Sequence, residues 1–115
     1  MMTADAPIGA MTYVADLAAM VTVASDSTVS RTALKAQGVR VVLFAFDAGQ
    51  ELTEHTAAVP VLLQVVSGRM RVGAAGESVD LGPGSLIHLT ARLPHTVLAL
   101  EPSQLQLTML DPRAT

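Results

Sequence analysis

Short apolar runs separated by turn residues fill the sequence after residue 26, and they constrain its fold more than any other feature. Most of these runs end at glycine, proline or serine, the residues that favour turns. Short strands at such regular spacing are typical of an antiparallel barrel or sandwich. We therefore predict an all-β fold with strands at 27–36, 39–46, 60–66, 69–72, 77–80, 85–89, 94–100 and 104–110.

Two of these runs carry more detailed information. Residues 39–46 are almost continuously apolar, so we expect this strand to be covered on both faces. Residues 104–110 alternate between polar and apolar, which places Leu105, Leu107 and Met109 on one face. Such a face is expected to point into a core.

The first 28 residues have a different character. Residues 1–10 are typical of a poorly ordered lead-in, whereas 13–20 contain good helix formers and predict a short helix. An extended arm that pairs with a neighbouring sheet is the alternative for this segment. The predicted organisation is an N-terminal arm or short helix at 1–28, a barrel at 29–110 and a C-terminal tail at 111–115.

Composition limits the partners of the chain. It has 115 residues, enough for one domain, and 50% of them are hydrophobic. Surplus apolar residues in a small domain often cover a subunit interface, so we expect a homodimer. The net charge of −3, without a cluster of Lys and Arg, argues against nucleic-acid binding.

Composition also excludes several kinds of site and location. The chain has no cysteine, which removes disulfides, thiolate metal sites and cysteine nucleophiles. No apolar run approaches the roughly 20 residues of a membrane helix. An acidic residue near the start argues against a secretory signal, so a cytoplasmic protein without membrane contact is expected.

The residues around two histidines resemble the two motifs of the cupin family. Gly49 and His55 match the glycine and the first histidine of the first motif, and Gly68 matches its closing glycine. The turn at 82–84 precedes the second motif, whose histidine matches His95.

A bacterial subgroup of minimal cupins is also similar to this chain, at residues 30–34 and 43–49. The resemblance covers about 29–110. It implies a jelly-roll barrel, or double-stranded β-helix, with a short N-terminal helix or arm. In such a barrel His55 and His95 come together in one pocket.

The resemblance also implies a reduced set of metal ligands. The second histidine of the first cupin motif falls on Ala57 and its glutamate on Val61, so His55 and His95 alone remain. Two imidazoles begin a site for a divalent transition-metal ion such as iron, manganese, nickel or zinc, but catalytic sites use three protein ligands.

Gln64 is the candidate for a third ligand. Strict alternation from His55 turns the Gln64 side chain away from the pocket. A bulge at Pro60 would shift that phase and turn Gln64 inward. Water completing the ion's shell is the alternative.

Other residues complete the predicted pocket. Arg92 precedes His95 at the expected mouth, where it either holds a carboxylate by a bidentate contact or is an exposed loop charge. A mostly apolar pocket suits a small molecule that bears one polar or anionic group. The apolar candidates for its wall are Phe44, Phe46, Val61, Leu63, Val65, Ile87, Leu89, Val97, Leu107 and Met109.

The remaining polar residues near the motifs are expected to lie outside the pocket. His88 alternates with core-facing neighbours, which favours an outer face or a dimer interface over a ligand role. Gln50, Glu51 and Glu54 flank the first motif and are typical of a solvated loop, and Gly73–Gly76 reads as a turn between strands.

Two functional classes follow from these residues. The first is a non-enzymatic protein that binds a small, mostly apolar molecule, with a depleted metal site. The alternative is a metal-dependent enzyme of the dioxygenase or isomerase type, with His55 and His95 as ligands. The reduced ligand set favours the first class, and no nucleophile elbow or phosphate-binding loop indicates another chemistry.

Overall fold

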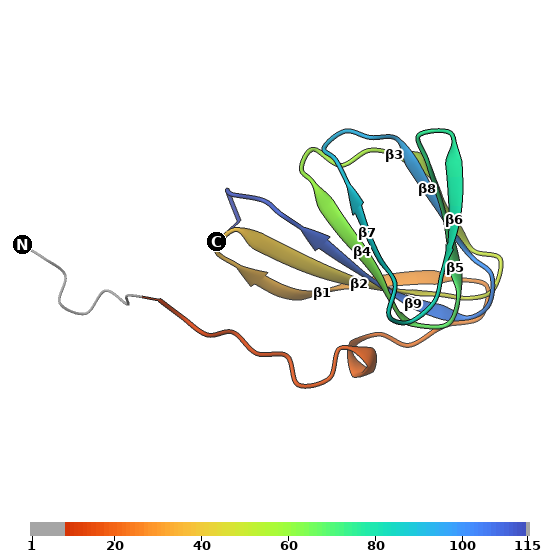
Figure 1. The fold of residues 1–115 in the computed structure, drawn as a ribbon. Coiled ribbons are helices and arrows are strands. Elements are labelled where there is room, and N and C mark those ends of the chain that lie inside the picture. Colours follow the sequence, from red (N-terminus) through yellow and green to blue (C-terminus); the bar gives the residue numbers. More distant parts are fainter. Residues whose placement is uncertain (1–8, 115) are drawn as a thin grey trace, which may run out of the picture.

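The structure, a computed structural model, describes residues 9–114, and the regular elements of this part of the chain are almost all β-strands (Figure 1). Most of the predicted lead-in therefore lies outside the described residues. A single 3-10 turn, η1, comes first, at Ala18–Met20. The strands are β1 (Thr28–Ala36), β2 (Val39–Phe46), β3 (Glu51–His55), β4 (Val61–Ser67), β5 (Met70–Ala74), β6 (Glu77–Leu81), β7 (Leu86–Leu89), β8 (His95–Ala99) and β9 (Ser103–Met109).

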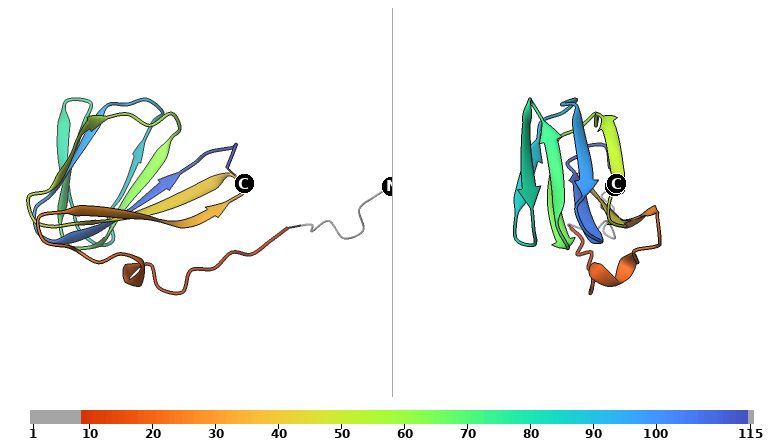
Figure 2. Two further views of the ribbon diagram at one scale, coloured as in Figure 1. Left: turned by 180° about the vertical axis from the view of Figure 1, so that it is seen from behind. Right: turned by 90° about the vertical axis from the view of Figure 1, so that its right-hand side faces the viewer.

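Two sheets face each other around the core (Figure 2). The larger sheet has five strands in the order β1-β2-β9-β4-β7, and the smaller has four in the order β3-β8-β5-β6. Neighbouring strands within each sheet run antiparallel. The chain passes repeatedly from one sheet to the other, as in a jelly roll, so the predicted all-β fold is confirmed.

Within residues 9–114, strand pairing does not join the two sheets at their edges, which are β1 and β3 on one side and β7 and β6 on the other. β6 ends the smaller sheet and β7 ends the larger one, and in the described part of the chain these two edges are not paired with each other. A single parallel bridge, between Val65 and Pro83, lies near the loop that connects them. Along this β6–β7 seam the sheets are held together mainly by side chains.

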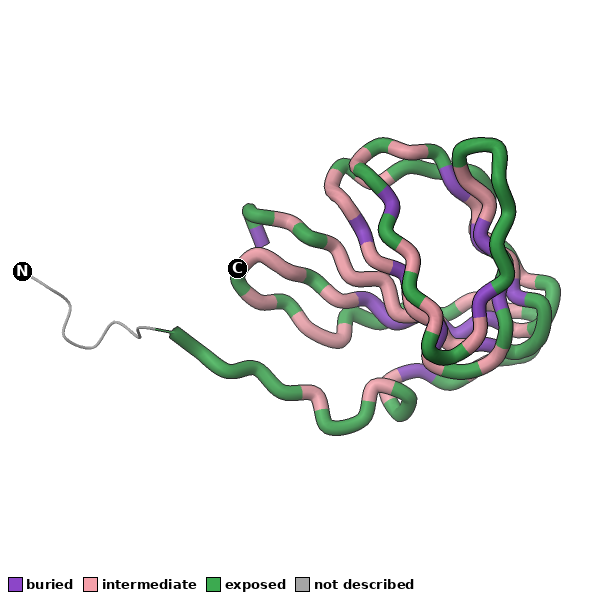
Figure 3. The backbone as a smooth tube through the Cα atoms, in the orientation of Figure 1, coloured by how far each residue is buried: buried purple, intermediate pink, exposed green. Residues whose placement is uncertain are grey.

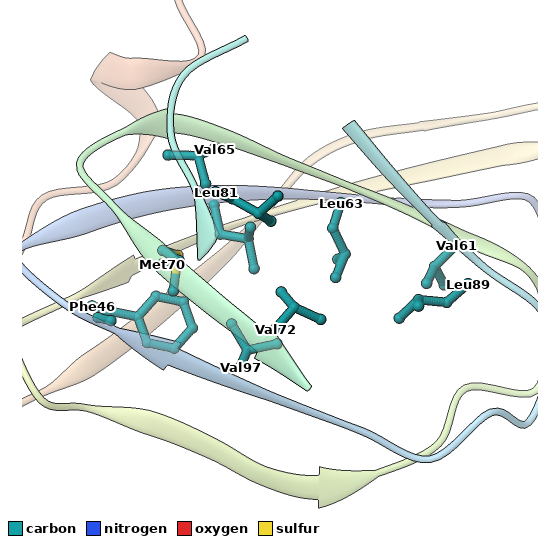
Figure 4. Close-up of a cluster of buried hydrophobic side chains, with 11 residues drawn as sticks. Phe46, Val61, Leu63, Val65, Met70, Val72, Leu81, Leu89 and Val97 are labelled. Atoms are coloured by element: carbon teal, nitrogen blue, oxygen red, sulfur yellow. The ribbon is translucent and has the colours of Figure 1, made fainter. Parts of the chain in front are cut away.

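The core is built from the inner faces of both sheets (Figures 3 and 4). In Figure 4, Phe46 lies beside Met70 at one end of the cluster, and Val61 lies beside Leu89 at the other. Burying one such side chain contributes about 1.5–3 kcal/mol. The buried members are Phe46, Val61, Leu63, Val65, Met70, Val72, Leu81, Leu89, Val97, Ala99 and Leu105.

The strand β9 presents its alternating apolar residues to this core, as predicted. Leu105 is fully buried, and Leu107 and Met109 pack against the cluster from the same face. Their partners in β4 lie in register, with Leu105 opposite Val65 and Met109 opposite Val61. The prediction from alternation is therefore confirmed.

The strand β2 is covered on both faces, also as predicted. Phe46 faces the core between the sheets, whereas Leu43 and Ala45 face outward and are nevertheless fully buried. The N-terminal arm, residues 9–27, crosses this outer face beneath the larger sheet (Figure 1) and packs Val21 against it. A second, smaller core therefore lies outside the barrel.

The predicted helix at 13–20 is wrong, because only the turn η1 forms there. The Gln104 side chain explains the difference. Its amide donates hydrogen bonds to the carbonyl oxygens of Ala18 (2.8 Å) and Val21 (2.9 Å), which holds the arm against β9. No helix within residues 9–114 has the length and apolarity needed to cross a membrane.

The strand β3 differs from the predicted loop around residues 50–54. Four of its five residues are exposed, because β3 is an edge strand of the smaller sheet. An exposed edge strand needs no apolar alternation, so ELTEH carries a weak strand signal. The other strands form as predicted, and their ends lie within one or two residues of the predicted positions.

Candidate functional site

The structure brings His55 and His95 together in the smaller sheet. His55 ends β3 and His95 begins β8, and the two residues are directly paired across these antiparallel strands. A register shift between Leu52 and His55 precedes the pair. The ring centroids lie 4.3 Å apart and the ring planes are inclined by 58°.

Each imidazole is oriented by a backbone carbonyl two residues earlier. The Nδ1 of His55 lies 2.8 Å from the carbonyl oxygen of Thr53, and the Nδ1 of His95 lies 2.9 Å from that of Leu93. A carbonyl oxygen only accepts hydrogen bonds, so both Nδ1 atoms carry the hydrogen. In the neutral ring this leaves Nε2 with a lone pair that can accept a hydrogen bond or bind a metal ion.

The two rings differ in exposure. His95 is 3% exposed, whereas His55 is exposed. A buried imidazole is costly unless it is hydrogen-bonded, and the Leu93 carbonyl meets that need. Among the described residues, every buried side-chain nitrogen and oxygen has a partner. The pair therefore lies at the boundary of the interior, with His95 on the buried side and His55 on the solvent side.

The register of the smaller sheet places a carboxylate in the same row. His95 is opposite Ala74 on β5, and Ala74 is opposite Glu77 on β6. Directly paired residues of neighbouring antiparallel strands share a face, so His55, His95, Ala74 and Glu77 form one row. Strands lie about 4.8 Å apart, which puts Glu77 roughly 10 Å from His95 along the row.

This spacing limits what the row can hold. Within residues 9–114, no three His, Asp or Glu side chains come close enough together to bind one metal ion. The described residues therefore supply two imidazole ligands, one short of a catalytic metal site.

A pocket of about 260 Å³ lies beside this row, at the β6–β7 seam. Two of its lining residues connect it to His95: Ala74 is paired with His95, and Leu93 accepts its hydrogen bond. Neither imidazole of the pair lines the pocket itself. Its lining residues are Val72, Ala74, Ala75, Glu77, Val79, Ile87, His88, Leu89 and Leu93.

Gln64 does not join the site, which corrects the orientation that a bulge at Pro60 would give. Leu63 and Val65 on either side of Gln64 are buried in the core, so Gln64 faces the outside of the larger sheet. The bulge of this strand lies later, between Val65 and Ser67, in its pairing with β9. Strict alternation from His55 gives the observed phase.

Of the other predicted pocket residues, Ile87 and Leu89 line the pocket and the remainder do not. Phe46 and Leu63 are completely buried in the core and do not line the pocket. Arg92 is exposed in the loop before His95, with φ at +65°, and its backbone N–H donates to the carbonyl of Ala57 (2.7 Å). The Arg92 side chain does not line the pocket.

His88 lies on the exposed edge strand β7, as predicted from alternation. It is paired with Leu62 and is separate from the two histidines of the row, although it borders the pocket. The role of Glu77 could not be predicted from the sequence. Its position depends on which strands lie next to β8, and no local pattern encodes that pairing.

Comparison with known proteins supports the fold. The chain matches no model of a known protein family and no curated protein. Solved structures match along most of their length. A conserved protein of unknown function from Streptococcus pyogenes has a TM-score of 0.78 and 28% identity, covering 91% of this chain and 92% of that one.

Two further structures carry a family name. A cupin superfamily protein from Desulfitobacterium hafniense has a TM-score of 0.77 and 18% identity, covering 83% of this chain and 87% of that one. An RmlC-like cupin protein from Desulfovibrio desulfuricans has a TM-score of 0.76 and 22% identity, covering 88% and 97%. At these identities the likeness concerns the fold.

Proposed function

The chain folds as a cupin domain, and on that premise we propose that it binds a small, mostly apolar molecule in the pocket at the β6–β7 seam. The observation that carries this proposal is the imidazole pair beside an apolar pocket. The pocket takes the body of the molecule. His55 and His95, each fixed by a carbonyl, supply acceptors for its polar group.

The donor set favours binding over metal catalysis. Two imidazoles without a third ligand among residues 9–114 do not make a catalytic metal site. The residues present therefore fit a divalent ion incompletely, and we assign no reaction step to one.

A metal-dependent enzyme of the dioxygenase or isomerase type is the second candidate. It is favoured by one observation: both Nδ1 atoms donate to carbonyl oxygens, which is how proteins commonly orient histidines that ligate metal. In that case His55 and His95 would hold the ion, with water completing its shell.

Binding of a neutral probe tests the first candidate. Benzyl alcohol has a small apolar body and one hydroxyl group, and we expect it to shift the amide NMR signals of Val72 and Leu89 in the pocket. Its affinity should fall a few-fold in His55→Ala, as for the loss of one hydrogen bond. Gln64→Ala, which removes a polar side chain from the outer face of the larger sheet and not from the pocket, should leave the affinity unchanged. Unchanged pocket signals at high probe concentration would contradict the proposal.

Metal content separates the two candidates. Protein purified without an affinity tag is analysed for iron, manganese, nickel and zinc by mass spectrometry. A binding protein should hold less than one equivalent of metal. One equivalent that is lost in His55→Ala and kept in His88→Ala would favour the enzyme.

We also propose that the partner of this chain is a second copy. Large apolar side chains remain exposed on the arm, where Met11 is 94% and Tyr13 80% exposed, and on the outer face of the larger sheet, where Leu86 is 60% exposed. Burying surfaces of this kind against each other is what drives stable homodimers.

A further inference from the structure

Among the described residues, Glu77 is the one carboxylate that lines the pocket, and its neighbours there are apolar apart from His88. We propose that Glu77 makes the site selective for a molecule with a cationic hydrogen-bond donor, such as a primary amine or an amidine, on an apolar body. This inference rests on the proposed function, because it names the chemical class that the same pocket takes.

The position of Glu77 is set by the sheet. It begins β6, directly after the Ala75-Gly76 turn, and lies in the row that contains His95. Ala74 stands between the two and has only a methyl group as its side chain. Ala74 also lines the pocket, so the lining extends along the row from Glu77 to the residue paired with His95.

No basic side chain of the described residues neutralises Glu77. The ion pairs in this part of the chain are Arg71 with Asp80 and Arg113 with Asp111. Arg71 precedes the buried Val72 on β5 and so points to the opposite face of the sheet. The Glu77 carboxylate therefore acts unpaired on the pocket.

The polar groups in and beside the pocket are mostly hydrogen-bond acceptors, whereas His88, which also lines it, has one donor and one acceptor nitrogen when neutral. Glu77 offers carboxylate oxygens, and His55 and His95 in their neutral form would offer Nε2 lone pairs, because Nδ1 carries the hydrogen that bonds to a carbonyl oxygen. An ammonium group has three donors and no acceptor. A carboxylate ligand would instead be repelled by the negative charge of Glu77, which is exposed to solvent on this side of the pocket.

The sequence predicts a ligand with one polar or anionic group, and this inference replaces the anionic alternative with a cationic group. That expectation depended on Arg92 as an anchor for an anionic group. Arg92 does not line the pocket, whereas Glu77 does. The sequence alone gave no reason to place Glu77 at the site.

Three probes of nearly the same shape test the charge preference: benzylamine, benzyl alcohol and benzoate. NMR titration follows the amide signals of Val79 and Leu89, which border the seam pocket. Thr96 borders a second, more open hollow of about 400 Å³ that also includes Glu77, so its signal reports binding there instead. We expect benzylamine to bind the seam pocket most tightly and benzoate least.

The variant Glu77→Gln keeps the shape and removes the charge. We expect it to weaken benzylamine binding about threefold, as for the loss of one solvent-exposed ion pair, and to leave benzyl alcohol binding unchanged. Unchanged binding of the alcohol also shows that the variant is folded. Glu51→Gln is the matched control, because Glu51 is an exposed carboxylate of the same sheet that does not line the pocket.

The outcomes separate this inference from the proposed function. If benzyl alcohol binds the seam pocket but benzoate binds as well as benzylamine, the inference is wrong and the proposed function stands. Equal losses in Glu77→Gln and Glu51→Gln would also refute it, as would benzylamine shifts confined to Thr96. If none of the three probes shifts Val79 or Leu89, both proposals fail.

Discussion

Replacing Gly68 by alanine should cost far more stability than the same change at another glycine with a similar backbone. Gly68 has φ at +88°, in the left-handed region, where an L residue costs about 1–2 kcal/mol. A Cβ atom there would overlap the Ser103 hydroxyl and lie 2.5 Å from the carbonyl oxygen of Pro102. Backbone or buried side chain must therefore move.

The movement would disturb a buried hydrogen-bonded group. Ser103 is completely buried, and its Oγ accepts from the backbone N–H of Arg69 (3.0 Å) and donates to the carbonyl of Glu101 (2.7 Å). Breaking such bonds in the interior costs about 1–3 kcal/mol. Together with the backbone strain, we expect Gly68→Ala to lower the free energy of unfolding by about 2–5 kcal/mol.

Gly84 provides the matched control. Its φ is +95°, but no atom of residues 9–114 beyond its chain neighbours lies within 4 Å of the position that a Cβ would take. Gly84→Ala should therefore cost only the strain of about 1–2 kcal/mol. Urea unfolding of both variants measures the difference. Equal losses would refute the role of Ser103 and reduce Gly68 to an ordinary turn glycine.

Two further predictions concern pH and assembly. The backbone N–H groups of Asp26 (2.8 Å) and Ala48 (2.9 Å) donate to the Asp47 carboxylate and lower its pKa. The resulting stability is present above the unfolded-state pKa of about 3.9 and is lost as pH falls through the lower folded-state pKa. Asp47→Asn should thus be less stable than the natural chain at pH 7, by urea unfolding, and the gap should close at strongly acidic pH; a constant gap would contradict this. Leu86→Asp should shift a dimer towards monomer in sedimentation velocity, and an unaltered sedimentation coefficient would argue against the outer face of the larger sheet as the interface.

The strands were predictable because each depends on its own residues. The apolar run of β2 required cover on both faces, and the structure supplies that cover from the barrel core and from the arm around Val21. The alternation of β9 likewise gave the correct inner face. In both strands the local pattern and the tertiary packing agree.

The parts that the sequence did not predict depend on residues far away in the chain. The helix expected at 13–20 gives way to hydrogen bonds from Gln104, which lies more than 80 residues later. Glu77 joins the row of His55 only because β6 and β8 both pair with β5. Helix propensity and strand alternation contain no information on either contact.

The unpaired β6–β7 seam has a consequence for how a ligand reaches the interior. Separating neighbouring strands within either sheet would break a ladder of backbone hydrogen bonds, whereas parting β6 from β7 breaks only the bridge at Pro83 among the described residues. The edges β1 and β3 are likewise not paired with each other in this part of the chain, but the pocket lies on the β6–β7 side. Side chains such as Val79 and Ile87 can then move apart while both sheets stay intact. The β6–β7 seam is thus the route by which we expect a ligand to enter. Amide hydrogens in β6 and β7 should then exchange with solvent faster than those in the central strands β8 and β9.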